Sequence, residues 1–136
     1  MSNDPAAEEV MRAAEAIVTA YGAHDTEAYF ASFHPEATFV FHTSPERLGS
    51  TAEFRAEWER WEREDGFRVL SCRSFDQHVQ VWGEVAVFTH TIEGTVRTAE
   101  GDESSTERET IVFARRPDGR WLAVHEHLSP LPAESD

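Results

Sequence analysis

The chain has 136 residues, enough for one domain with a single hydrophobic core. Its 26 acidic residues outnumber the 12 basic residues, which are all arginine, and the net charge is −14. A surface this acidic repels phosphate backbones and anionic lipid headgroups, which disfavours nucleic acid and membranes as partners. Because the sequence contains no lysine, Schiff-base and lysine-nucleophile chemistry are excluded.

The first ten residues contain neither a basic region nor an apolar run, and no stretch of 18 apolar residues occurs in the sequence. We therefore expect neither a signal peptide nor a membrane span, and we expect a cytoplasmic location. Cys72 is the only cysteine, so no intrachain disulfide can form. Its place within a predicted strand favours a packed small hydrophobic side chain over a nucleophile.

Two helices and a strand are predicted at the start of the chain. Asp4-Pro5 is typical of a helix start, and Gly22 ends that helix. Asp25 caps a shorter second helix, which His34-Pro35 ends. Residues 37–42 (ATFVFH) then predict the first strand.

A third helix follows a loop punctuated by proline and glycine. Residues 50–53 (STAE) fit a capping box, in which serine and glutamate satisfy orphan backbone donors. Phe54, Trp58 and Trp61 follow at i, i+4 and i+7, which places them on one helix face. Gly66 ends this helix.

The second half of the chain changes to a period of two and predicts four strands, over residues 67–82, 85–97, 106–116 and 120–129. A two-residue turn joins the first two strands, a polar loop the next two and a three-residue turn the last two. Residues 76–78 are the expected place of a β-bulge that would help to curl the sheet. Helices followed by an antiparallel meander predict one α+β domain over residues 1–136, with about residues 5–130 as its ordered core.

The turns predict which residues lie opposite each other across neighbouring strands. The predicted pairs are Val79 with Phe88, Gln77 with His90, Ile92 with Ile111, His90 with Phe113, Ile111 with His125, and Glu109 with His127. One face of the sheet is then mostly apolar, with three histidines and a glutamate set into it. The other face carries threonines and valines and, in the last strand, Leu122, Val124, Glu126 and Leu128.

The C-terminal run RPDGRWLAVHEHLS, preceded by ERETIVFAR, resembles the ending of the SnoaL-like and nuclear transport factor 2-like superfamily. The pattern is most similar to the association domain of calcium/calmodulin-dependent protein kinase II. The residues that carry the match are Asp118-Gly119, Trp121, Val124, His125, His127 and Ser129, with Glu109-Thr110 upstream. The first half agrees through Asp25, Glu27 and Tyr29, then Pro35-Glu36.

The resemblance implies a cone-shaped, cystatin-like α+β barrel, in which a strongly curved, mostly antiparallel sheet packs against N-terminal helices around a pocket. Relatives pair through the outer face of the sheet, and some are isomerases, cyclases or dehydratases. The arginines expected in the kinase-domain cavity fall on Ile92 and Ile111 here, which predicts an apolar cavity with few polar groups. Tyr21 and Tyr29 lie on the predicted helices and give no counterpart of the ketosteroid isomerase trio.

Three candidate catalytic residues follow from the predicted inner face: Glu109, His127 and His90. The pair of Glu109 and His127 is equally compatible with a structural ion pair. Candidate ligand-binding residues are Trp58, Phe88, Ile92, Ile111, Phe113 and His125. His125 and His127 have a spacing that can hold a metal, and with His90 nearby a three-histidine site is conceivable. Hydrogen-bonded histidines at a pocket floor are favoured instead, and we expect neither a metal nor a cofactor.

Two functions of different classes remain open from the sequence. The first is a small-molecule-binding protein, acting as an acid–base enzyme of isomerase, cyclase or dehydratase type on an apolar oxygenated substrate. The second is a non-catalytic ligand-binding or oligomerisation module. Neither the substrate nor the side to which His42 points follows from the sequence. In both cases we expect a homodimer formed through the outer sheet face.

Overall fold

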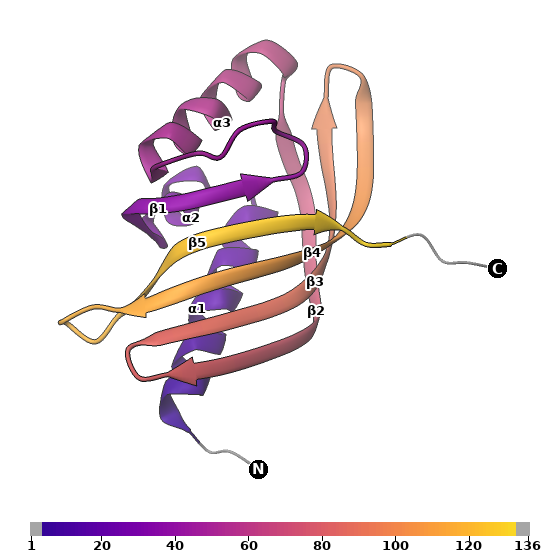
Figure 1. Ribbon diagram of the computed structural model, residues 1–136. Helices are drawn as coiled ribbons and strands as arrows, with labels where there is room; N and C mark the ends of the chain where they lie inside the picture. The colour runs from indigo at the N-terminus through magenta and orange to yellow at the C-terminus, as the bar shows by residue number, and fades with distance from the viewer. Residues whose placement is uncertain (1–3, 133–136) are drawn as a thin grey trace.

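The computed structural model describes residues 4–132, which form an open five-stranded sheet with helices packed on one side (Figure 1). The elements in chain order are α1 (Pro5–Gly22), α2 (Thr26–Ala31), β1 (Phe33–Phe41), α3 (Thr51–Asp65), β2 (Arg68–Trp82), β3 (Val85–Thr98), β4 (Gly101–Arg115) and β5 (Trp121–Pro130). The strand order is β1-β5-β4-β3-β2. β1 runs parallel to β5, and every other neighbouring pair is antiparallel. The predicted α+β class is confirmed.

The helix boundaries follow from local capping. The side chain of Asp4 accepts a hydrogen bond from the backbone of Ala6, and Asp25 caps α2 in the same way. Ser50 accepts from the backbone N–H of Glu53 at 3.1 Å, which confirms the predicted start of α3. Gly66 ends α3 with φ 64°, a left-handed conformation that glycine adopts without steric cost.

The first strand begins earlier than the sequence indicated. α2 ends at Ala31, and β1 starts at Phe33 instead of residue 37. Phe33, Ala37 and Phe39 are buried, so this segment packs against the core from its first residue. β1 lies at the edge of the sheet, where Pro35 interrupts no ladder between two neighbouring strands.

The predicted pairing of β2 with β3 is correct from the turn up to a bulge. Val79 lies opposite Phe88, as expected. The register shifts between Phe75 and His78, and Asp76 has φ 55°, which confirms the predicted bulge. The pairing of Gln77 with His90 was wrong, because the bulge removes Gln77 from the ladder.

The β3–β4 hairpin is longer than predicted. Thr98 lies opposite Gly101, so a two-residue turn replaces the polar loop expected between residues 97 and 106. His90 therefore lies opposite Glu109, and the predicted pairings of Ile92 with Ile111 and of His90 with Phe113 were wrong. The error is four residues, an even number, so the residues of β3 and β4 keep their predicted faces.

The β4–β5 pairing is correct at the turn and shifts by one residue further along. Phe113 lies opposite Ala123, whereas Val112 lies opposite His125, so Val124 is an extra residue in β5. Beyond this bulge every side chain of β5 changes face. Glu109 lies opposite Leu128, and the predicted pairings of Glu109 with His127 and of Ile111 with His125 were wrong.

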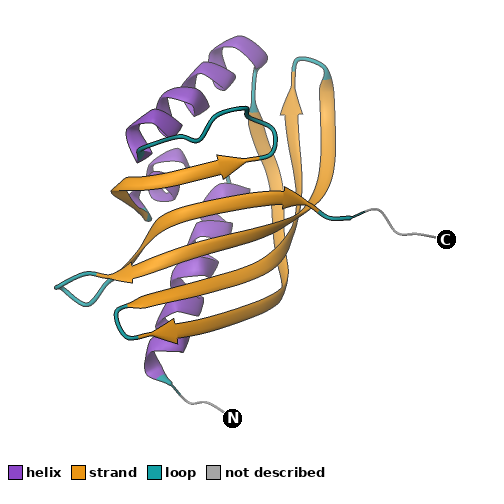
Figure 2. Ribbon diagram, in the orientation of Figure 1, coloured by secondary structure: helices purple, strands orange, loops and turns teal. Residues whose placement is uncertain are grey.

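The sheet bends strongly along β2, β3 and β4, so that one half of each strand lies over α1 and the other half rises beside α3 (Figures 1 and 2). The core fills the space between sheet and helices, and Val10, Phe39, Phe88, Ile111 and Phe113 are fully buried there. The cone shape expected from the sequence agrees with this curvature, although the sheet does not close. Among the described residues, no helix is long and apolar enough to cross a membrane.

Candidate functional site

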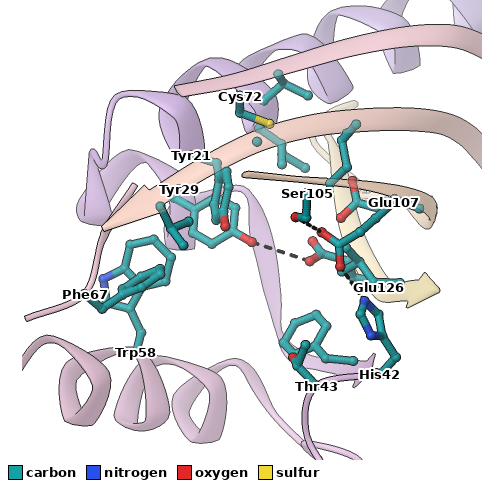
Figure 3. A pocket seen from close by; sticks show the side chains of 18 of the residues that line it. Tyr21, Tyr29, His42, Thr43, Trp58, Phe67, Cys72, Ser105, Glu107 and Glu126 are labelled. Atoms are coloured by element: carbon teal, nitrogen blue, oxygen red, sulfur yellow. Dashed lines mark hydrogen bonds and ion pairs between the residues drawn. The ribbon is translucent and has the colours of Figure 1, made fainter. Parts of the chain in front are cut away.

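The bend of the sheet leaves a cavity of about 370 Å³ between its inner face and the three helices. Figure 3 shows side chains from α1, α2, α3 and the strands pointing into this space. The wall on the helix side is aromatic and includes Tyr21, Tyr29, Trp58 and Phe67. The ring of Trp58 lies 5.4 Å from that of Tyr29 and 5.1 Å from that of Phe67. This side of the cavity is rigid, because its rings are packed against one another.

Two glutamates reach the cavity from the sheet side. Glu109 on β4 is 7% exposed and Glu126 on β5 is 2% exposed. The two carboxyl groups lie close enough to influence each other's protonation. The hydroxyl of Tyr29 donates to Oε1 of Glu126 at 3.5 Å. Oε2 of Glu126 is buried and has no hydrogen-bond partner among the described residues.

Burial changes the acidity of this carboxyl pair. It raises the pKa of Glu109 to about 8, because a charged carboxylate loses its solvation in the cavity wall. Burial, together with the charge of Glu109, raises the pKa of Glu126 well above its usual value. The pair therefore holds at least one proton at neutral pH. Two interacting carboxyl groups of this kind titrate as one coupled unit.

His90 lies directly behind Glu109. Its Nε2 is 2.6 Å from Oε1 of Glu109, and its Nδ1 is 2.6 Å from the hydroxyl of Ser74. Gln77 donates to the same hydroxyl at 2.9 Å. Burial lowers the pKa of His90 to about 4, so the ring is neutral at neutral pH. A neutral imidazole can donate to an ionised Glu109, or accept from a protonated one, by exchanging tautomers.

The mouth of the cavity is polar. His42 and Glu107 are joined by a hydrogen bond of 2.5 Å between Nε2 and Oε2, and Ser105 donates to Glu107 at 3.5 Å (Figure 3). The sequence left the direction of His42 open, and the structure places it at the cavity. Glu103 lines the same end and is exposed.

The structure brings only part of the predicted site together. Trp58, Ile92 and Glu109 line the cavity. Three other predicted ligand-binding residues are fully buried in the core and do not reach it: Phe88, Ile111 and Phe113. The two histidines of β5 lie on the outer face, because the bulge at Val124 turns them away from the cavity. His125 contacts Thr38 there at 2.8 Å, and His127 is exposed.

Glu126, Tyr21 and Tyr29 are among the cavity residues that the predicted site lacked. Glu126 was placed on the outer face because a regular β5 was assumed, and the bulge turns it inward. Tyr21 and Tyr29 were set apart from the site because they lie on helices, yet both rings line the cavity. Burial raises the pKa of both phenols, and the pKa of the Cys72 thiol to about 12, so all three are neutral at neutral pH.

No set of three or more histidine, cysteine, aspartate or glutamate side chains in residues 4–132 is arranged to hold a metal ion. The rings of His125 and His127 are 5.9 Å apart on the outer face, whereas His90 belongs to the inner face. The three-histidine arrangement considered from the sequence therefore does not form.

These features define a class of protein: an α+β domain whose open, bent sheet encloses a cavity against its helices. The family model of the SnoaL-like domain matches residues 10–134, and the chain belongs to this family. No curated protein matches the sequence. The resemblance to the SnoaL-like and nuclear transport factor 2-like superfamily is thereby confirmed.

Solved structures share the fold at low sequence identity. A nuclear transport factor 2-like protein from Salmonella enterica serovar Typhimurium has a TM-score of 0.80 and 18% identity, with 99% of this chain and 96% of that chain covered. A ketosteroid isomerase-like protein from Erwinia carotovora has a TM-score of 0.79 and 18% identity, with coverages of 96% and 99%. A Xanthomonas campestris protein named for the calcium/calmodulin-dependent protein kinase II association domain has a TM-score of 0.74 and 19% identity, with coverages of 91% and 86%.

Proposed function

We propose that this protein binds an apolar, oxygenated small molecule in the cavity and acts on it as an acid–base enzyme. The observation that carries the proposal is the proton-holding pair of Glu109 and Glu126 at the wall of an apolar cavity. Ligand sites of this size are mostly apolar, with a few polar groups that orient the ligand. A general acid or base is most effective when its pKa lies near the working pH, as burial arranges for Glu109.

The pair supports a proton-transfer reaction of the isomerase or dehydratase type. In its singly protonated state, the carboxylate of Glu109 accepts a proton from a carbon next to a carbonyl group. The protonated carboxyl of Glu126 donates a hydrogen bond to the carbonyl oxygen, where negative charge develops. The proton held by Glu109 then returns to a different atom of the substrate, so the enzyme ends in its starting state.

His90 is a positioning residue in this proposal. Its ring does not line the cavity, but its hydrogen bonds to Glu109 and Ser74 fix the orientation of the Glu109 carboxyl group. Because the ring stays neutral, it can adapt to both protonation states of Glu109 without creating a buried positive charge. Trp58 and Ile92 remain proposed ligand contacts, since both line the cavity. We do not extend the proposal to His125 or His127, which lie on the opposite face of the sheet.

The second candidate is a non-catalytic ligand-binding or assembly module. It is favoured by the uncovered outer face of the sheet, which offers a surface for a second copy of the chain. The homodimer and the cytoplasmic location expected from the sequence are also proposals. Turnover distinguishes the two candidates, because an assembly module needs neither a proton-holding carboxyl pair nor a substrate.

Site variants assayed on a panel of enolisable ketones and β-hydroxy ketones test the enzyme proposal. Glu109→Gln removes the base and preserves the shape of the side chain, so we expect a loss of turnover of about a hundredfold or more. His127→Ala is the matched control, since it alters the outer face, and should leave turnover unchanged. Full activity in Glu109→Gln would contradict the proposal. A wild-type protein that is inert on the panel, yet retains a small molecule in native mass spectrometry, would favour the binding module.

A further inference from the structure

The ionisable side chains around the cavity are almost exclusively acidic. Four carboxyl groups line it, from Glu103, Glu107, Glu109 and Glu126. Among the described residues, no arginine side chain lines the cavity, and the only basic group, His42, is hydrogen-bonded to Glu107. A chain with a net charge of −14 adds to the negative potential of such a recess. An anionic ligand would therefore be repelled.

Three of these glutamates form a row along β4, which runs from the mouth of the cavity to its floor. Glu103 is exposed, Glu107 is half-buried and Glu109 is buried. We call these three residues the carboxylate row. Opposite them, α3 and its neighbours present the faces and edges of aromatic rings, including Trp58, Tyr29 and Phe67. The cavity is thus a slot with carboxyl groups on one wall and aromatic rings on the other, an arrangement that suits a cation.

The cavity wall also contains a buried hydrogen-bond acceptor that lacks a donor in the described part of the chain. Oε2 of Glu126 is a buried acceptor that no described residue supplies with a donor. The hydroxyl of Tyr29 is directed at Oε1 of the same carboxyl group. A buried polar atom without a partner costs free energy. A ligand that brings its own N–H donors would remove this cost, whereas a ligand that offers only acceptors would not.

We infer that the ligand of this cavity carries a protonated amine on an apolar body, with the ammonium group held by the carboxylate row and Glu126 and the apolar body packed on the aromatic wall. The inference deepens the proposed function and rests on the same cavity. With Glu126 bound to the ammonium group, the carboxylate of Glu109 remains available as the base of the proton transfer described above. No covalent step is involved in this recognition.

Binding of an ammonium group changes the protonation of the carboxyl pair. A positive charge next to Glu109 and Glu126 stabilises their ionised forms, so their shared protons leave when the amine binds. The charged and titratable groups around the pair are Glu107 on β4, Tyr21 and Tyr29 on the helices, Cys72 on β2, and His90 on β3. The tyrosines and Cys72 stay protonated and His90 stays neutral at neutral pH, so none of these four groups contributes to the protons released.

Three probes with one skeleton test the inference: 4-phenylbutylamine, 4-phenylbutan-1-ol and 4-phenylbutanoate. Isothermal titration calorimetry on the full chain, in buffers with different ionisation enthalpies, gives both the affinity and the protons released. We expect the amine to bind about tenfold more tightly than the alcohol, the carboxylate not to bind, and the amine alone to release protons.

Variants show whether the binding occurs at this site. Glu126→Gln should weaken binding of the amine about tenfold and leave the alcohol unaffected, since the amide keeps the shape and cannot ionise when the amine binds. Glu36→Gln, an exposed glutamate on β1, is the matched control and should change nothing. Equal affinity for amine and alcohol would overturn the inference and leave the proposed function intact. Absence of binding by all three probes would overturn it as well. Loss of turnover in Glu109→Gln is measured independently, so the two failures are distinguishable.

Discussion

The burial of Glu109 and Glu126 beside each other is the unusual feature at the scale of single residues. Among the described residues, neither carboxyl group has a charged basic partner, because the neighbouring His90 is itself uncharged at neutral pH. The protein meets the cost of burial by keeping protons on the pair. A group that holds a proton at neutral pH in a dry wall is also one that can give and take it, which connects the burial to the proposed chemistry.

The raised pKa values predict how stability depends on pH. The folded pKa of Glu109 is about 8 against an ordinary value of 4.5, so the folded protein binds more protons than the unfolded chain in this range. Stability falls with rising pH wherever the folded state binds more protons. His90 has the opposite effect on stability, because its folded pKa of about 4 lies below the ordinary 6.5 and the folded state binds fewer protons between these values. Above pH 6.5 the ring is neutral in both states, so His90 no longer changes stability with pH.

We therefore expect the free energy of unfolding to fall between pH 6.5 and pH 8 by on the order of 1 kcal/mol per pH unit. Urea unfolding followed by tryptophan fluorescence at several pH values measures it. The double variant Glu109→Gln with Glu126→Gln should fold, since an amide resembles the protonated carboxyl group, and should lose this dependence. A double variant that keeps the wild-type slope would show that other groups cause it.

Which residues belong to the site was easier to predict from the sequence than the face of the sheet to which each side chain points. Glu109, Ile92 and Trp58 were assigned to the site, and all three reach the cavity. Glu126 was assigned outward because both faces of β5 carry apolar residues, so the alternation of the strand gives no sign of the bulge. Trp121 and Ala123 are inward at odd positions, whereas Leu128 lines the cavity at an even one. This switch of the inward apolar residues from odd to even positions is what could have indicated the bulge. It is hard to detect in the sequence because Leu122 and Val124, at even positions, are apolar as well.

At the scale of elements, the helices follow from their sequence and the strand registers follow only in part. Capping residues act locally, so Asp4, Asp25 and Ser50 mark helix starts without knowledge of the rest of the fold. Register depends on turn length and on bulges, which a single strand does not specify. The β3–β4 turn was predicted as a loop because its glutamates, aspartate and serines have low strand propensity, yet pairing along the hairpin keeps them extended.

The bulge in β2 allows a test of how the bend is built. Asp76 has φ 55°, a left-handed conformation that glycine adopts freely and valine adopts at a cost of about 1–2 kcal/mol. We expect Asp76→Gly to match or exceed the wild type in urea unfolding and Asp76→Val to be destabilised. Gln80 is an exposed position with negative φ in the same strand. There we expect Gln80→Val to be more stable than Gln80→Gly, because valine favours a regular strand. The same order at both positions would contradict the assigned backbone conformation.

At the scale of the whole molecule, the helices cover one face of the sheet and leave the other uncovered (Figure 1). An outer patch on this face consists of Val87, Thr89, Thr110, Val112, Leu122 and Val124, all half-buried. Trp82 and Val85 pair with each other at the β2–β3 hairpin and are 67% and 42% exposed. Leu128, which the sequence placed in this patch, points into the cavity instead. Apolar residues on three neighbouring strands form a contiguous surface whose exposure to water costs free energy.

A symmetric second copy is the simplest cover for the outer patch. Two-fold pairing brings the same patch together twice and leaves no free surface for further growth. A face of this kind would bury roughly 1,600 Å² in total, the usual area of a stable dimer. The net charge of −14 opposes open-ended stacking, because each added subunit increases the repulsion.

We therefore expect size-exclusion chromatography with light scattering to give twice the chain mass of 15.4 kDa at micromolar concentration. Val112→Arg places a charge at the centre of the outer patch, next to Val87 and His125 on the neighbouring strands, and should yield a folded monomer. Ala52→Arg introduces the same charge on the exposed side of α3 and should remain dimeric. A wild-type mass of one chain would refute the dimer. A dimer that persists in Val112→Arg and is lost in Ala52→Arg would place the interface on the helices instead of the sheet.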